Sequence, residues 1–138
     1  MELDERLYEK ITDLCDEGEG LLEEGLYEKA LTKYKKALDL LPLPKEEWEA
    51  STWIYSAIGD TYFLKKDYKT ASTYFYNALN CPDGISNPFI LLRLGQSLFE
   101  IRDLEKSKEY LLKAYMLEGY NIFNDEDDKY INLILDII

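Results

Sequence analysis

Residues 59–82 read GDTYFLKKDYKTASTYFYNALNCP, and this stretch decides the fold. Its small and large side chains recur at fixed distances, at Gly59, Tyr62, Ala71, Phe75, Ala78 and finally Pro82. Small residues allow two helices to approach closely, and large ones fill the space between neighbouring pairs. Asp67 lies in the break between the two halves and is well placed to cap the second helix. The stretch therefore predicts a helix–turn–helix unit.

Two other segments repeat this pattern. The earlier copy carries Gly18, Leu21, Ala30, Tyr34, Ala37 and Pro42, and the later one carries Gly95, Leu98, Ser107, Leu111, Ala114 and Gly119. Their central breaks are Glu24-Gly25-Leu26-Tyr27 and Arg102-Asp103-Leu104, and Asp103 is again a favourable N-cap. Repeats of this kind bury their apolar faces by stacking, so the chain is expected to form a solenoid.

The three copies resemble the tetratricopeptide repeat (TPR) over about residues 11–121. The resemblance implies an all-α protein, a right-handed TPR superhelix of three helix–turn–helix repeats with a C-terminal capping helix. We expect a single TPR domain over residues 1–138. Its repeats would cover approximately residues 11–44, 52–85 and 88–121, and the capping helix approximately residues 125–138.

The spacing of the glycines departs from the 34-residue period of the family. Gly18 and Gly59 are 41 residues apart, and Gly59 and Gly95 are 36 apart. The first excess falls in residues 43–51, where Pro44 suits a first helical turn, so we predict that the first helix of the second repeat begins about two turns early. The smaller excess falls in the turn-rich residues 81–88.

The C-terminus combines an acidic cluster, residues 125–128, with an apolar stretch that continues to Ile138. Acidic residues suit the positive end of a helix dipole, and the apolar residues behind them could cover the last repeat. Two interpretations remain open for this stretch: a cap folded onto the solenoid, or a contact between two copies in a homodimer.

Charge and composition exclude several classes of function. The formal net charge is −12 and histidine is absent. Binding to nucleic acid or to an anionic membrane surface is therefore not expected, because both need clustered cations. Cys15 and Cys81 have no metal-ligand spacing and Cys15 has no histidine to activate it, so we expect packing thiols in a reducing cytoplasm. We expect no enzyme, hence no catalytic residue, and no metal or cofactor.

Function should then depend on the surface that the repeats form. The TPR resemblance implies that the first helix of each repeat lines a groove for a protein or peptide partner. By register from each glycine, the candidate partner-binding residues are Cys15, Glu19, Glu23, Trp53, Ser56, Asp60, Phe63, Phe89, Leu92, Arg93, Gln96, Phe99 and Glu100, with Leu22 beside them. The same helical spacing would also suit Trp53, Phe63, Phe89 and Phe99 as core residues between neighbouring helices.

The residue types in this set favour a basic partner. The TPR clamp that binds acidic chaperone C-termini needs Lys and Asn where this chain has Cys15 and Glu19. Aromatic area beside carboxylates instead favours apolar anchors and Lys or Arg. Stretches such as 87–96, 114–116 and 122–130 also resemble small bacterial TPR proteins, some of which are immunity partners that bind and neutralise toxins. The alternative is a secretion or assembly chaperone that holds an extended client segment.

Overall fold

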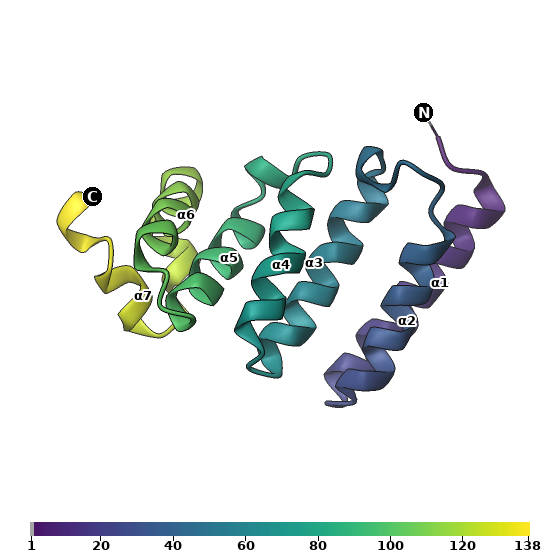
Figure 1. The fold of residues 1–138 in the computed structure, drawn as a ribbon, viewed down its shortest axis with the longest axis horizontal. Helices are drawn as coiled ribbons and strands as arrows, with labels where there is room; N and C mark the ends of the chain where they lie inside the picture. Colours follow the sequence, from purple (N-terminus) through teal and green to yellow (C-terminus); the bar gives the residue numbers. More distant parts are fainter. Residues whose placement is uncertain (1) are drawn as a thin grey trace.

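The computed structural model describes residues 2–138, which form three antiparallel helix pairs stacked side by side, followed by a short C-terminal segment (Figure 1). The seven α-helices of these residues are α1 Glu5–Glu23, α2 Tyr27–Leu40, α3 Glu49–Leu64, α4 Tyr68–Leu79, α5 Pro88–Glu100, α6 Leu104–Glu118 and α7 Asp128–Asn132. Short 3-10 turns lie between them: η1 Lys45–Glu47, η2 Gly84–Ser86, η3 Gly119–Phe123 and η4 Leu135–Ile137. The predicted all-α superhelix of three repeats is confirmed.

Each pair is held close by the glycine that the repeat pattern singled out. A Cβ atom at Gly18 would lie 2.7 Å from the ring of Tyr34, and one at Gly59 would lie 3.0 Å from the ring of Phe75. At Gly95 the nearest atoms, at 2.7 Å, belong to the side chain of Leu111. The large residue of each second helix thus packs directly on the backbone of the first helix.

The turns between paired helices also follow the repeat. Gly25, Lys66 and Arg102 each lie seven residues after the packing glycine, and their φ angles are 77°, 66° and 71°. After the turn, the side chain of Asp67 accepts a hydrogen bond from the backbone N–H of Thr70 at 3.3 Å. Asp103 accepts one from Lys106 at 3.4 Å, so both predicted N-caps are confirmed.

The first helix of the second repeat starts earlier than its counterpart in the third, but by less than the sequence suggested. Residues 45–47 form the turn η1, Trp48 is extended, and α3 begins at Glu49. The side chain of Lys45 holds this turn by donating hydrogen bonds to the carbonyls of Leu38 and Leu41, 2.8 and 2.9 Å away. The residues in excess of the 34-residue period therefore form η1 and one additional turn at the start of α3.

The C-terminal segment, residues 119–138, differs from the predicted single helix over 125–138. Its α-helix covers only Asp128–Asn132, and a separate 3-10 turn follows at Leu135–Ile137. Asp127 caps the short helix by accepting the N–H of Lys129 at 3.0 Å, which is the use expected for the acidic cluster. The apolar residues are divided between these short elements: Tyr130 and Ile134 are buried, whereas Leu135 and Ile137 are about half exposed.

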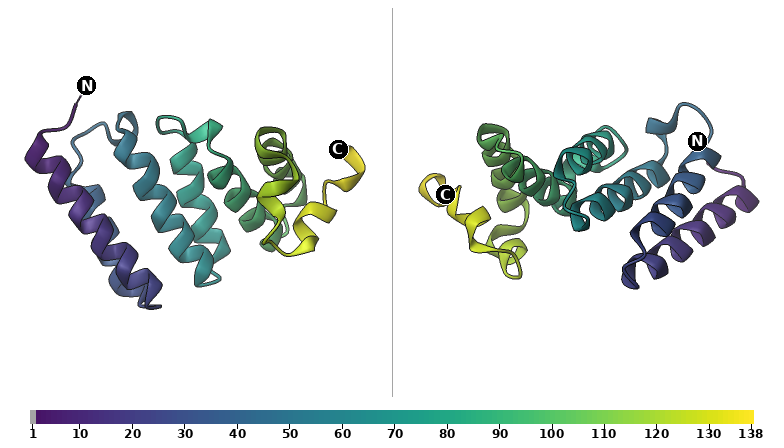
Figure 2. Two further views of the ribbon diagram at one scale, coloured as in Figure 1. Left: turned by 180° about the vertical axis from the view of Figure 1, so that it is seen from behind. Right: turned by 60° about the horizontal axis from the view of Figure 1, so that its bottom comes forward.

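The two sides of the solenoid are made by different helices. In Figure 1, α1 lies behind α2, and when the molecule is seen from behind α1, α3 and α5 come forward (Figure 2). The C-terminal segment lies on that same side, against α5. Of the buried apolar side chains that join the layers, Ile54, Ile58, Phe75 and Leu111 are fully buried. The first helices and the C-terminal segment thus share one face of the molecule.

Candidate binding groove

A pocket of about 590 Å³ opens on the face formed by the first helices. We call it the central pocket. Its walls come from α1, α2, α3, the start of α5 and the loop before it; the lining residues are Cys15, Glu19, Leu22, Tyr34, Glu49, Thr52, Trp53, Ser56, Ala57, Asp60, Pro82, Asp83, Asn87 and Phe89. The pocket therefore spans all three repeats and belongs to no single one.

The central pocket is acidic. Glu19, Glu49, Asp60 and Asp83 line it, and no Lys or Arg is among its lining residues. The negative charges of these carboxylates also affect the pKa of nearby groups that can lose a proton. Burial raises the pKa of the Cys15 thiol to about 11, with help from the charges of Asp16 and Glu19, so this cysteine stays protonated. An arriving cation would meet carboxylates from several different elements.

Tyr34 on α2 also lines the pocket, and the same carboxylates affect its phenol. Burial raises the pKa of its phenol to about 12, and the charges of Glu19 and Asp60 add to the effect. Its hydroxyl is therefore neutral at physiological pH. Tyr34 thus keeps a hydrogen-bond donor available at the floor of an acidic pocket.

Two partly exposed aromatic side chains line the pocket. Trp53 on α3 is 38% exposed and Phe89 on α5 is 40% exposed. Phe89 is steadied by an edge-on contact with the buried ring of Phe75, with centroids 6.4 Å apart. Exposed faces of this size suit contact with a partner's side chains. Neither residue is therefore a core residue.

Arg93 shows how this face binds a guanidinium group. Its guanidinium carbon lies 4.6 Å from the ring centre of Phe63 and 5.3 Å from that of Phe89. Its Nε donates to Oδ1 of Asp60 at 3.2 Å, and its Nη1 donates to Oε1 of Glu126 at 2.8 Å. Aromatic faces and carboxylates together stabilise a cation better than either alone.

Burial and Arg93 have opposite effects on Asp60. Burial raises the pKa of its carboxyl, and the nearby Arg93 offsets only part of that effect. Its hydrogen bond to Arg93 uses Oδ1. Asp60 therefore lines the pocket as a partly buried carboxylate that Arg93 already compensates in part.

The C-terminal segment covers the same face at the third repeat. Leu92 is 4% exposed and packs in a cluster with Phe123, Tyr130 and Ile134. Gln96 is fully buried, where it accepts a hydrogen bond from Arg93 and donates one to Glu126. These contacts close the groove at its third repeat.

The remaining third-repeat candidates are held by the same segment. Phe99 packs edge-on against Tyr130 with ring centres 5.3 Å apart. Glu100 accepts the hydroxyl of Tyr130 at 3.0 Å and pairs with Lys129 at 3.1 Å. Burial and the Glu100 charge raise the pKa of Tyr130 well above its usual range, so this donor stays protonated.

The candidates predicted from the sequence therefore divide into three groups. The central pocket brings together Cys15, Glu19, Trp53, Ser56, Asp60 and Phe89. The C-terminal segment engages Leu92, Arg93, Gln96, Phe99 and Glu100, which as groove-lining residues are now covered. Outside the pocket lie Phe63, which contacts Arg93 and Tyr68, and Glu23, which is exposed near the end of α1.

Sequence reasoning missed the pocket residues that the inter-repeat connections supply. Pro82, Asp83 and Asn87 come from the loop between α4 and α5, and Glu49 comes from the added turn of α3. The turn-rich composition of residues 81–88 was the available signal, because loops between repeats tend to lie at the rim of a groove.

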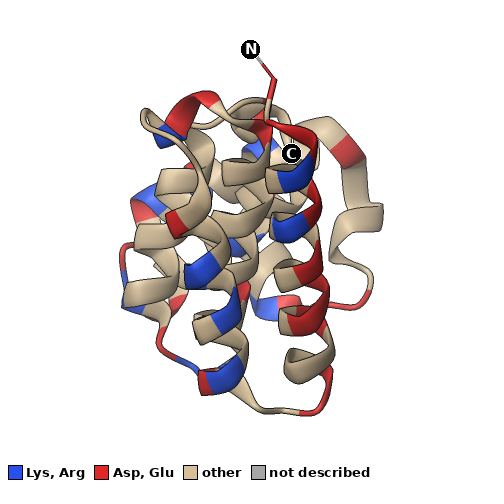
Figure 3. Cartoon of the chain, turned by 90° about the vertical axis from the view of Figure 1, so that its right-hand side faces the viewer, with Lys and Arg blue, Asp and Glu red and all other residues tan. Residues whose placement is uncertain are grey.

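Charge separates the two helices of the first repeat. Helix α1 carries seven acidic and two basic residues, whereas α2 carries four lysines and two acids. Figure 3 views the molecule from the end formed by the first repeat and shows the acidic α1 beside the more basic α2. One such contact is an ion pair of 3.0 Å between Lys33 and Glu17. On the side that carries the pocket, the excess of acidic residues therefore comes mainly from α1.

Within residues 2–138, no three His, Cys, Asp or Glu side chains are grouped so that they could hold a metal ion. No helix in the same range has the length and apolar character needed to cross a bilayer.

Comparisons with known proteins place these features in context. A family model described as "Tetratricopeptide repeat" matches residues 90–121. No curated protein matches the sequence. Among solved structures, the C-terminal TPR-containing domain of a Plasmodium falciparum protein is 25% identical, with a TM-score of 0.74 over 96% of this chain and 88% of that one.

Two other similar structures contain bound peptides. The first TPR of Spaghetti (RPAP3) with the HSP90 peptide SRMEEVD is 19% identical, with a TM-score of 0.71 over 90% of this chain and 86% of that one. The second TPR domain of human RPAP3 with the HSP70 peptide SGPTIEEVD is 16% identical, with a TM-score of 0.72 over 93% and 94%. Three stacked helix pairs, packing glycines and these matches lead to one conclusion: the chain has the fold of a tetratricopeptide repeat domain, and its residues 90–121 match the model of that repeat.

Proposed function

We propose that this TPR protein binds a basic segment of a protein partner in its central pocket. The observation that carries the proposal is the lining of that pocket, which combines four carboxylates with the exposed faces of Trp53 and Phe89 and contains no Lys or Arg. Such a pocket attracts Lys and Arg side chains and repels the acidic peptides found in two of the similar structures.

Peptides provide a direct test. The basic probe is a fluorescein-labelled peptide with blocked ends in which Leu and Arg residues alternate, and its binding is followed by anisotropy. Trp53→Ala and Phe89→Ala should each weaken binding at least about tenfold, because both remove large apolar faces from the centre of the contact. Circular dichroism should show that both variants remain folded.

Met116→Ala is the matched control, because Met116 is 74% exposed on α6 and outside the pocket. This variant should bind the basic probe like the original chain. If Trp53→Ala and Phe89→Ala also bind unchanged, the central pocket is not the binding site.

In its sharpest form the proposal is that the chain acts in the bacterial cytoplasm as an immunity protein, which binds a basic toxin domain and blocks it. The support is the resemblance described above together with the acidity of the pocket face. The test adds the purified chain to a toxin domain encoded by the neighbouring gene and measures toxin activity. Loss of activity at a one-to-one ratio is expected, and undiminished activity in the presence of excess chain would contradict it.

The alternative is a secretion or assembly chaperone that holds an extended client segment. The observation that favours it is that the pocket runs across first helices of successive repeats, which suits an extended chain. An unfolded client fragment that binds more tightly than the same protein when folded would support the chaperone role over the immunity role.

A further inference from the structure

A second pocket, of about 520 Å³, adjoins the central one at the N-terminal end of the molecule. We call it the N-terminal pocket. Its lining residues are Glu2, Leu3, Glu5, Tyr8, Glu47, Trp48, Glu49, Ala50, Trp53 and Pro82. Because Glu49, Trp53 and Pro82 also line the central pocket, the two pockets share a wall with Trp53 in it.

The N-terminal pocket is built on a firm base. Trp48 is 7% exposed, and its indole N–H donates to the carbonyl of Pro42 at 2.8 Å. Leu3 and Leu7 pack against the core, and Asp4 caps α1 by accepting the N–H groups of Arg6 and Leu7. The chain segments on either side of the pocket are thus held by packing and hydrogen bonds that a ligand need not supply.

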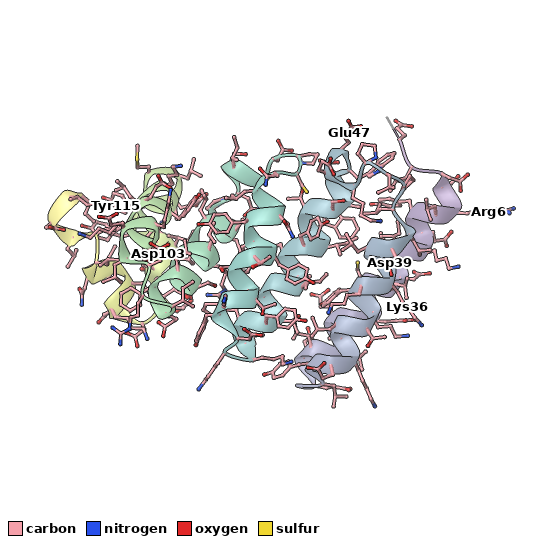
Figure 4. The ribbon with its side chains drawn as sticks, in the orientation of Figure 1. Arg6, Lys36, Asp39, Glu47, Asp103 and Tyr115 are labelled. Atoms are coloured by element: carbon pink, nitrogen blue, oxygen red, sulfur yellow. The ribbon has the colours of Figure 1, made fainter. Side chains whose placement is uncertain are left out.

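The carboxylates of this pocket are not neutralised by the cations closest in sequence. Glu2, Glu5, Glu47 and Glu49 line it without any Lys or Arg. Lys45, two residues before Glu47, is turned away and donates to carbonyls at the end of α2. Arg6 extends outward from α1, while Glu47 lies on the turn near the N-terminal segment (Figure 4).

We propose that the N-terminal pocket is a second subsite for a Lys or Arg side chain of the same ligand. This inference rests on the proposed function. The partner segment would be extended and bipartite, with one basic side chain in each pocket and its backbone crossing Trp53. Charge complementarity selects this occupant, since both pockets are acidic, contain aromatic or apolar walls and lack cations of their own.

Two subsites joined across one side chain make the spacing of the ligand's charges matter. Once one basic residue is bound, the second binds as an intramolecular event, and the gain is greatest when the linker matches the span. A ligand with a single basic residue would bind only one pocket at a time. The geometry thus predicts selection for pairs of basic residues at a preferred separation.

The test compares two peptide probes. The two-anchor probe has two Leu-Arg pairs joined by a Gly-Ser spacer whose length is varied, and the one-anchor probe replaces the second Arg by Gln. The two-anchor probe should bind about fivefold or more tightly than the one-anchor probe at its best spacer length. Equal affinity of the two probes at every spacer length would overturn the inference.

Charge variants separate the two pockets. The double variant Glu5→Gln/Glu47→Gln should lower the affinity for the two-anchor probe about fivefold. It should change the affinity for the one-anchor probe less than about twofold. Glu19→Gln in the central pocket should weaken both probes. The control Glu105→Gln/Glu118→Gln, at exposed positions of α6, removes two equal charges and should affect neither.

The possible failures are distinguishable. If Glu19→Gln weakens both probes and Glu5→Gln/Glu47→Gln weakens neither, the second subsite is wrong and the proposed function stands. If Glu5→Gln/Glu47→Gln lowers the affinity for both probes to the same degree, the effect comes from the overall negative charge of the protein, and the second subsite is again excluded. If neither probe binds the original chain, the proposed function itself fails.

Discussion

Replacing Arg93 by Ala should destabilise the protein by about 3 kcal/mol and release the C-terminal segment. The side chain of Arg93 is 18% exposed, and its guanidinium connects Asp60 on α3 with Glu126 of the C-terminal segment. Its removal leaves the side chains of Asp60 and Glu126, 24% and 19% exposed, without their cation. It also leaves the side-chain oxygen of the buried Gln96 without the hydrogen bond that Arg93 donates. A partly buried carboxylate without its cation destabilises the folded state by more than the intact ion pair stabilises it.

Urea unfolding at neutral pH measures the loss, and hydrogen exchange locates it. Amide exchange should accelerate over residues 119–138 more than over α1 and α2. Lys106→Ala is the control, because Lys106 and its partner Glu109 are both largely exposed, and it should cost less than about 1 kcal/mol. An Arg93→Ala loss no greater than that of the control would mean that the network does not hold the segment.

The same variant should show a characteristic dependence on pH. Arg93 lowers the pKa of Asp60 against the larger effect of burial, so its removal raises that pKa further. The folded protein then holds the Asp60 proton at pH values where the unfolded chain, with a pKa of about 3.9, has released it. The penalty of Arg93→Ala should therefore grow as the pH rises from about 4.5 towards neutrality.

Gly84→Ala should also destabilise the protein by about 3 kcal/mol, because the added methyl group meets backbone. A Cβ atom at Gly84 would lie 2.0 Å from the carbonyl oxygen of Ala78 and 2.8 Å from the Cα of Leu79. Neither atom can turn aside as a side chain would, so η2 must move away from α4. Asp83 and Asn87, on either side of η2, line the central pocket and would move with it.

Gly20→Ala is the matched control for this substitution. Gly20 lies inside α1, and nothing stands within 4 Å of a Cβ atom there. Alanine is a better helix former than glycine, so the free energy of unfolding of this variant should rise by about 1 kcal/mol. Thermal unfolding of both variants checks the pair. A Gly84→Ala variant within about 0.5 kcal/mol of the original chain would show that η2 does not depend on this close approach.

The repeat pattern predicts most of the fold because each repeat is a local device. Gly18, Gly59 and Gly95 can be recognised in the sequence, and each packs on the large residue that the pattern names. The C-terminal segment was harder to predict, since a five-residue helix has almost no periodicity of its own. Its position is fixed by contacts with Leu92, Arg93 and Gln96, far away in the sequence.

The candidate groove was predictable to the extent that it follows the register of the first helices. Trp53, Asp60 and Phe89 lie at register positions and line the central pocket. Asp83 and Glu47 come from connections outside the repeat pattern, so no register could place them. The acidic character of the groove was nevertheless foreshadowed, because residues 1–28 contain eleven acidic and two basic residues.

The central claim is that an acidic, aromatic pocket selects a basic segment, and one titration tests it most directly. The basic probe is compared with an acidic probe in which every Arg is replaced by Glu, at low and at high salt. We predict saturable binding of the basic probe that weakens as salt is added, and no binding of the acidic probe. Equal binding of both probes, or binding of the acidic probe alone, would contradict the account.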